Sequence, residues 1–233
     1  MKKLLIAGVL VAGIAATASA QTNAPALTVA PVAATTNAPV VPTPATNDPF
    51  DDPLIKQIQA RHEKAVNGDT KETKALTTDL EKWSQEQPKN YLLQAYLGST
   101  YTLDSRDAWP GPGKLTYLRN GGKLLDGAVA ADPDNPAVRF VRAIDYFELP
   151  FFFGKGKTAR DDFQLLLKQI DGDVKTPYTL NVETQQAIYY YAGLSYQQLS
   201  QTPEAKTAWQ NGVKLDPKSE LAAKMQIELA KVK

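Results

Sequence analysis

From Asp52 to the end of the chain, apolar side chains recur every three or four residues, which is the spacing of amphipathic α-helices. Proline, glycine, asparagine and aspartate cluster between these stretches and mark turns. No run of four to eight residues alternates as a half-buried strand does. The sequence therefore predicts an all-α fold, with helices over residues 54–66, 70–87, 90–104, 114–131, 136–148, 157–170, 183–199, 203–215 and 219–232.

The first twenty residues are typical of a secretory signal peptide. Lys2 and Lys3 form a cationic start, Leu4–Ala16 is apolar, and Ala18-Ser19-Ala20 has the small-x-small pattern of a cleavage site. The apolar run is shorter than the ~20 residues that span a bilayer, so a membrane anchor is the weaker interpretation. We expect residues 1–20 to be removed after Ala20 and the mature chain to be exported, to a periplasm or outside the cell, with no membrane insertion afterwards.

Residues 21–50 are expected to form a linker. They are rich in alanine, proline, threonine and valine, with no charge before Asp48 and no aromatic residue before Phe50. Such a segment buries too little apolar surface to offset its ordering entropy, which indicates disorder. The predicted organisation is therefore a signal peptide (1–20), a disordered linker (21–50) and a helical domain (51–233).

Composition excludes several chemistries. The chain has no cysteine and one histidine, His62. Disulfides, thiolate catalysis and multi-histidine metal sites are therefore ruled out, and we expect no cofactor and no bound metal. Without Lys2 and Lys3 the 26 basic residues become 24 against 25 acidic ones, a net charge of −1, which predicts no attraction to nucleic acids or anionic membranes.

Residues 186–219 resemble a tetratricopeptide repeat, in which small residues let two antiparallel helices approach and large residues fill the space between them. The positions that carry this likeness are Tyr189, Gly193, Tyr196, Ala205, Trp209, Gly212 and Pro217. The resemblance implies a stack of helical hairpins, with residues 219–232 as the terminal helix that covers the last apolar face.

The same frame recurs earlier with insertions. Its weaker copies contain Leu76, Leu80, Trp83 and Pro88; Leu97, Gly98, Tyr101, Gly121, Leu125, Ala128 and Pro133; and Ala143, Tyr146, Ala159 and Phe163. The insertions resemble those of a group of bacterial proteins in this superfamily, with an Arg106-Asp107-Ala108 loop, an Asp134-Asn135 turn followed by arginines, and a Leu149–Gly154 segment of the form LPxFFG. That resemblance implies the fold and no particular activity.

A hairpin stack of this kind implies a concave groove lined by the first helix of each pair, which binds a protein or peptide partner. Aromatic residues on such a face dock extended or helical segments. The expected groove residues are Phe140, Ile144, Phe147, Tyr190, Leu194 and Gln197. An equally favoured alternative is that Phe140 and Phe147 pack beneath the Pro150–Phe153 loop, whose three consecutive phenylalanines are expected to be buried.

The second functional hypothesis is a receptor for a small ligand or anion, with a pocket around Arg106, Trp109, Arg139 and Arg142. The competing structural interpretation is a buried ion pair between Arg142 and Asp145, because a buried guanidinium must be paired.

No catalytic constellation stands out, and the chain is expected not to be an enzyme. The Gly154–Thr158 segment ends like a phosphate-binding loop, but its first glycine is replaced by Phe151 and no strand precedes it. His62 lies between Arg61 and Glu63, which favours a solvated residue over a catalytic base.

Overall fold

The structure is a computed structural model that describes residues 47–108 and 111–232. The expected signal peptide and residues 21–46 of the expected linker lie outside these ranges, as does Trp109. Residues 47–50, which the sequence assigned to the linker, belong to the folded unit. Asn47 donates to the Pro177 carbonyl, and Phe50 is buried.

The all-α prediction is confirmed: the described ranges contain helices and no strand. A 3-10 turn, η1 (Pro49–Asp51), precedes α1 (Pro53–Val66) and α2 (Thr70–Glu86). The remaining elements are α3 (Tyr91–Asp107), α4 (Pro112–Ala131), α5 (Pro136–Glu148), the 3-10 turn η2 (Phe151–Phe153), α6 (Gly156–Ile170), α7 (Val182–Gln198), α8 (Thr202–Leu215) and α9 (Glu220–Lys231). Most boundaries fall within two residues of the predicted ones, and α3 runs three residues further than predicted.

The helix starts follow from local chemistry. Side-chain oxygens accept hydrogen bonds from first-turn amides at six α-helices, and the capping residues are Asp52, Asp69, Asn90, Asn135, Asn181 and Ser219. Proline occupies the first turn of α1, α4, α5 and α8, where its missing amide hydrogen costs nothing. These capping residues and prolines fix the residue at which each helix begins.

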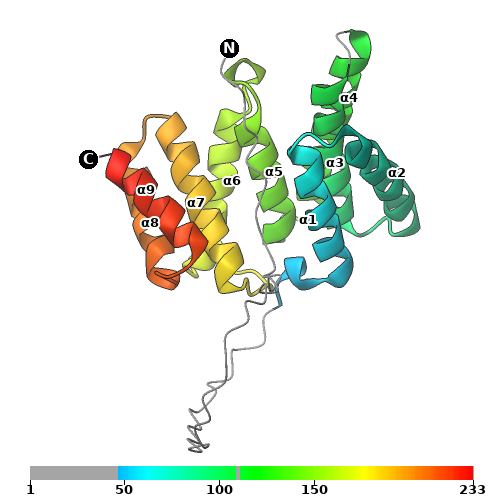
Figure 1. Ribbon diagram of the computed structural model, residues 1–233. Helices are drawn as coiled ribbons and strands as arrows, with labels where there is room; N and C mark the ends of the chain where they lie inside the picture. Colours follow the sequence, from blue (N-terminus) through cyan, green and yellow to red (C-terminus); the bar gives the residue numbers. More distant parts are fainter. Residues whose placement is uncertain (1–46, 109–110, 233) are drawn as a thin grey trace, which may run out of the picture. The chain divides into compact units, whose positions relative to one another are not determined.

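The helices alternate between two layers. Each α-helix packs against the next one, and α1, α3, α5, α7 and α9 also pack side by side in that order. Successive helices run in opposite directions (Figure 1). The connections from each odd-numbered helix to the following even-numbered one lie at one end of the unit, called the upper end here, and the other connections lie at the lower end. No helix in the described ranges is long and apolar enough to cross a membrane.

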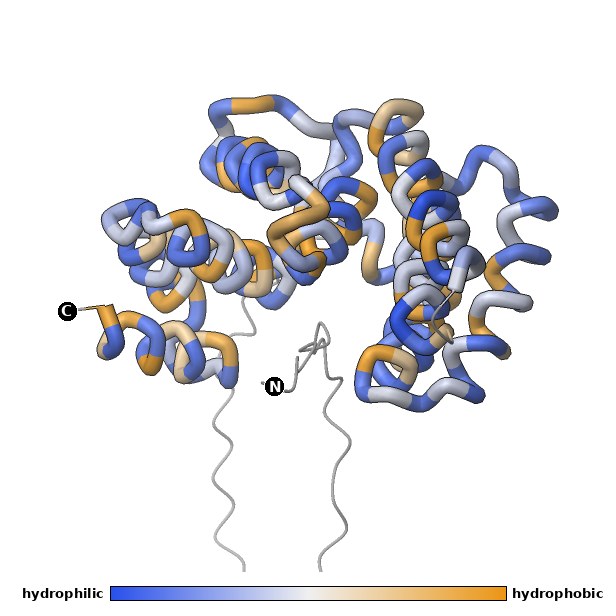
Figure 2. Tube along the Cα trace, turned by 90° about the horizontal axis from the view of Figure 1, so that it is seen from above, coloured by the Kyte–Doolittle hydropathy of each residue, from blue (hydrophilic) through white to orange (hydrophobic). Residues whose placement is uncertain are grey.

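Viewed along the helices, polar and apolar residues alternate with the helical turn (Figure 2), and the apolar ones form one main core. Glycine permits the closest contacts inside two hairpins. Gly98 of α3 and Gly121 of α4 face each other, and a Cβ on Gly121 would lie 2.6 Å from the Gly98 carbonyl oxygen. Gly193 of α7 faces the indole of Trp209 on α8, which is fully buried.

This packing predicts opposite effects for two alanine substitutions. Gly193→Ala drives a methyl group into the Trp209 ring and should lower the free energy of unfolding by about 1–3 kcal/mol, the usual cost of overpacking. Gly127→Ala, in α4 with nothing within 4 Å of the new Cβ, should raise it by up to about 1 kcal/mol through helix propensity. Urea denaturation measures both. Equal effects of the two changes would contradict the close contact between α7 and α8.

Candidate functional site

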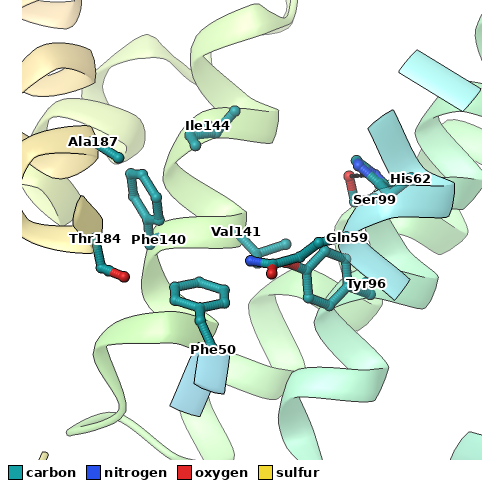
Figure 3. Close-up of a pocket in the computed structure, with 10 residues that line it drawn as sticks. All are labelled: Phe50, Gln59, His62, Tyr96, Ser99, Phe140, Val141, Ile144, Thr184 and Ala187. Carbon is teal, nitrogen blue, oxygen red and sulfur yellow. Dashed lines mark hydrogen bonds between the residues drawn. The ribbon is translucent and has the colours of Figure 1, made fainter. Parts of the chain in front are cut away.

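A pocket opens where η1 and the odd-numbered helices α1, α3, α5 and α7 meet. Its cavity volume is about 40 Å³. Its lining is Phe50, Gln59, His62, Tyr96, Ser99, Phe140, Val141, Ile144, Thr184 and Ala187. Figure 3 shows these side chains converging from separate helices. Residues that are 137 positions apart in the sequence, Phe50 and Ala187, therefore contribute to one cavity.

Aromatic packing builds the apolar side of the pocket. Asp48 accepts a hydrogen bond from the amide of Phe50 and another from the amide of Asn181, so the chain before α1 is tied to the start of α7. This places the Phe50 ring edge-on to Phe140, with 6.2 Å between the ring centres. Phe140 also makes edge-to-face contacts with Phe163 and Tyr191. The pocket therefore has a rigid aromatic wall.

The opposite side of the pocket carries polar groups from α1 and α3. His62 Nε2 lies 3.0 Å from the Ser99 hydroxyl, and its ring packs edge-on to Tyr96. The side-chain amide of Gln59 has a buried Nε2 and interacts with the Tyr96 hydroxyl. A mostly apolar cavity with a few convergent polar groups has the composition of a ligand-binding site.

Burial changes the chemistry of His62. Removal from solvent, helped by the positive charge of Arg106, lowers the pKa of its imidazole to about 4. His62 is therefore neutral at physiological pH and can both donate and accept a hydrogen bond in the pocket. His62 was predicted to be solvated, whereas it is half-buried, because α1 packs against α2 through Arg61 and against α3 through His62.

The predicted groove residues divide into two groups. Phe140 is only 2% exposed and belongs to the core beneath the pocket. Ile144 lines the pocket, and Phe147, Tyr190 and Leu194 are half-buried against the core, as Gln197 is half-buried on α7. The odd-numbered helices thus continue the apolar lining beyond the pocket along α5 and α7.

The Pro150–Phe153 loop is not buried, and the prediction of burial was wrong. Phe151 and Phe152 are exposed, and the buried aromatic contacts of Phe140 come from η1, α6 and α7. The loop lies at the upper end of the unit, where α5 and α6 join. The α5–α6 connection turns the chain at the ends of the two helices, so its side chains do not reach the core.

The arginines of the ligand pocket predicted from the sequence form hydrogen bonds with other groups of the protein. Arg139 and Arg142 of α5 both donate to the buried carboxylate of Asp162 on α6, at 2.7 Å each. Arg106 donates to the carbonyls of Ala65 and Val66 and to Asp107. The two regions share no hydrogen-bond partner among the described residues, and Trp109 lies outside them.

The predicted pairing of Arg142 with Asp145 was wrong. Arg142 faces α6, whereas Asp145 turns toward α3 and accepts a 2.6 Å hydrogen bond from Thr102. Burial raises the pKa of Asp145 to about 7. Burial and the charge of Asp145 raise the pKa of Glu148, three residues on, to about 7 as well. Neither side chain lines the pocket.

No family model, curated protein or solved structure matches this chain. Within residues 47–108 and 111–232, no group of three histidine, cysteine, aspartate or glutamate side chains is placed to hold a metal ion.

Several pocket residues were not predicted from the sequence. Phe50 was assigned to the linker, and Gln59 and Thr184 carry no motif. Phe50 was the easiest of these to predict from the sequence, because it is the first aromatic residue after a long segment without any and follows Asp48, the first charge of that segment.

The neutral imidazole in the pocket is directly measurable. His62 is the only histidine of the chain, so its NMR signals need no mutagenesis for assignment in the untagged protein. We expect the imidazole to titrate with a midpoint near pH 4, because burial disfavours the charged form. Between about pH 6 and pH 8 we therefore expect no protonation of the ring and only a small change in its chemical shifts, passed on from Asp145 through the Ser99 hydroxyl. A midpoint near the ordinary histidine value of about 6.5 would contradict the burial of His62.

Proposed function

We propose that this chain is an exported scaffold of tetratricopeptide-like helical hairpins, which binds a peptide segment of a partner protein on the face formed by α1, α3, α5 and α7. The observation that carries the proposal is the pocket in which these four helices meet. The tetratricopeptide likeness is supported by the alternation of helices between two layers and by the contact of Gly193 with Trp209. The proposal of export is supported by the pattern of residues 1–20.

The lining of this face suits a peptide with one small apolar anchor. The wall formed by Phe50 and Phe140 is rigid, so the receptor loses little conformational entropy when a side chain inserts. Ile144, Phe147 and Tyr190 offer half-buried apolar surface next to the pocket for flanking residues. Ser99, His62 and Gln59 supply hydrogen bonds for the peptide backbone at the other side of the pocket.

Peptide selection tests the proposal. Peptides enriched from a random displayed library by the mature chain should bind the isolated protein and lose about tenfold or more in affinity to Ile144→Glu, since a charge at the pocket mouth disfavours an apolar anchor. Tyr190→Glu should weaken the same peptides. The matched control is Leu215→Glu, an exposed position at the end of α8 in the even-numbered layer, which should leave binding unchanged. Fluorescence anisotropy measures affinity, and circular dichroism verifies the helices of each variant.

Two outcomes would count against a peptide groove. Peptides that bind wild type and Ile144→Glu equally would place the binding surface elsewhere. A chain that enriches no peptide, but whose melting temperature rises with one small metabolite and not in Gln59→Leu, would favour the second candidate below.

The second candidate function is a small-ligand receptor that uses the same pocket. The observation that favours it is the mostly apolar lining with a few polar groups, among which the Gln59 amide can donate to a carbonyl or carboxylate oxygen of a ligand. This version replaces the one centred on Arg139 and Arg142, whose guanidinium groups are neutralised by Asp162.

A further inference from the structure

The connection between α5 and α6 presents three phenylalanines to solvent. We call Phe151–Phe153 the aromatic tip. Phe151 is 87% exposed and Phe152 is 70% exposed. The backbone beneath them is ordered, because the amide of Phe153 donates to Pro150 and that of Gly154 donates to Phe151. Gly154 adopts a left-handed conformation with φ of 68° that closes the turn. The rings contact one another, and the fold offers no apolar surface to cover Phe151 and Phe152.

A second apolar projection lies at the same end of the unit. The first turns of α4 carry Leu115, which is 57% exposed, and Tyr117, which is also exposed. Figure 1 shows the start of α4 and the α5–α6 connection both extending beyond the other connections at the upper end. Two separate segments therefore present apolar or aromatic side chains on one side of the protein.

Both projections are cationic. Residues 149–160 contain Lys155, Lys157 and Arg160. Lys155 pairs with Asp126 of α4, and the other two pair with Asp161. Residues 111–125 contain Lys114, Arg119 and Lys123 and no carboxylate. The connections at the lower end have the opposite character: the segments 48–52, 86–90, 132–135, 171–181 and 216–219 together contain nine carboxylates and three lysines. The upper connections also carry carboxylates, Asp69, Asp107 and Glu148, so the positive character is confined to the two projections.

We propose that the upper end docks on an anionic phospholipid surface. Phe151 and Phe152 enter the boundary between headgroups and acyl chains, where aromatic side chains are favoured. The lysines and arginines of both projections then lie at the level of the phosphate groups. The acidic lower end faces away from the surface. This inference is independent of the proposed peptide groove, since none of these residues lines the pocket.

The geometry favours a membrane surface over a protein groove. The aromatic tip and the start of α4 are separate elements, with α5 between them in the chain, and both project at one end of the unit. A flat, fluid surface meets both at once. An anionic bilayer also presents distributed negative charge to the exposed cations Arg119, Lys123 and Lys157.

Vesicle sedimentation tests the proposal. The mature chain should sediment with vesicles made of equal parts phosphatidylglycerol and phosphatidylcholine, and much less with pure phosphatidylcholine. Phe151→Ser with Phe152→Ser should lower partitioning about tenfold, because both rings leave water only on the bilayer. Lys157→Glu with Arg119→Glu should reduce the preference for phosphatidylglycerol. At 1 M salt, where the Debye length is about 3 Å, the preference should disappear.

The matched control is Ile227→Ser, which removes an exposed apolar side chain from α9, outside both projections. It should leave partitioning unchanged, and all variants should keep the helical circular dichroism of the wild type. Wild type that fails to prefer phosphatidylglycerol vesicles would overturn the proposal. So would a concentration-dependent dimer that the Phe151→Ser, Phe152→Ser variant lacks, since it would assign the aromatic tip to a second copy of the chain.

Discussion

The structure depends on close approach between the two helices of the hairpins α3–α4 and α7–α8. Between α3 and α4 this approach rests on Gly98 and Gly121, where any larger side chain would meet the opposite backbone. Between α7 and α8 it rests on Gly193, which gives space to the Trp209 ring, whose indole nitrogen donates to the Tyr190 carbonyl. Because each even-numbered helix sits tightly on its partner, the odd-numbered helices are left to pack against one another in a single layer.

The α5–α6 hairpin is held differently, by charge. Asp162 of α6 is almost fully buried and accepts hydrogen bonds from Arg139 and Arg142 of α5. Two guanidinium groups on one carboxylate need further partners, which the Pro133 carbonyl and Asp126 provide. Removing Asp162 alone would leave buried positive charge without compensation, so the network is a cross-link between two helices rather than a vacant anion site. This network also holds α5 in the orientation that points Ile144 toward the pocket.

The sequence predicted the helices well because their ends carry strong local signals. Asn135 followed by Pro136, for example, both caps α5 and sets its first turn. Contacts between helices were harder to predict from the sequence. Arg142 and Asp145 are three residues apart on one helix, yet one faces α6 and the other α3, a distinction that spacing on a single helix does not resolve. The pocket was hidden for the same reason, since its wall joins Phe50 to Phe140 across 90 positions of sequence.

The expectation of a buried Pro150–Phe153 loop was wrong, because an apolar composition does not tell how far a segment lies from the core. The helices α5 and α6 complete their core before the chain turns, and η2 then projects beyond it. The two exposed features of the protein consequently have separate places: an apolar and partly polar pocket on the odd-numbered layer, and aromatic and cationic projections at the upper end. The proposed peptide contact and the proposed lipid contact therefore lie on separate surfaces of the protein.

The most direct test of the central claim is site-specific photo-cross-linking in cells that export the protein. A photoreactive residue at position 144, on the odd-numbered layer, should give one discrete adduct that disappears with Tyr190→Glu, whereas the same residue at the exposed position 164 of α6 should give none. An adduct from position 164 and none from position 144 would contradict binding on the odd-numbered layer.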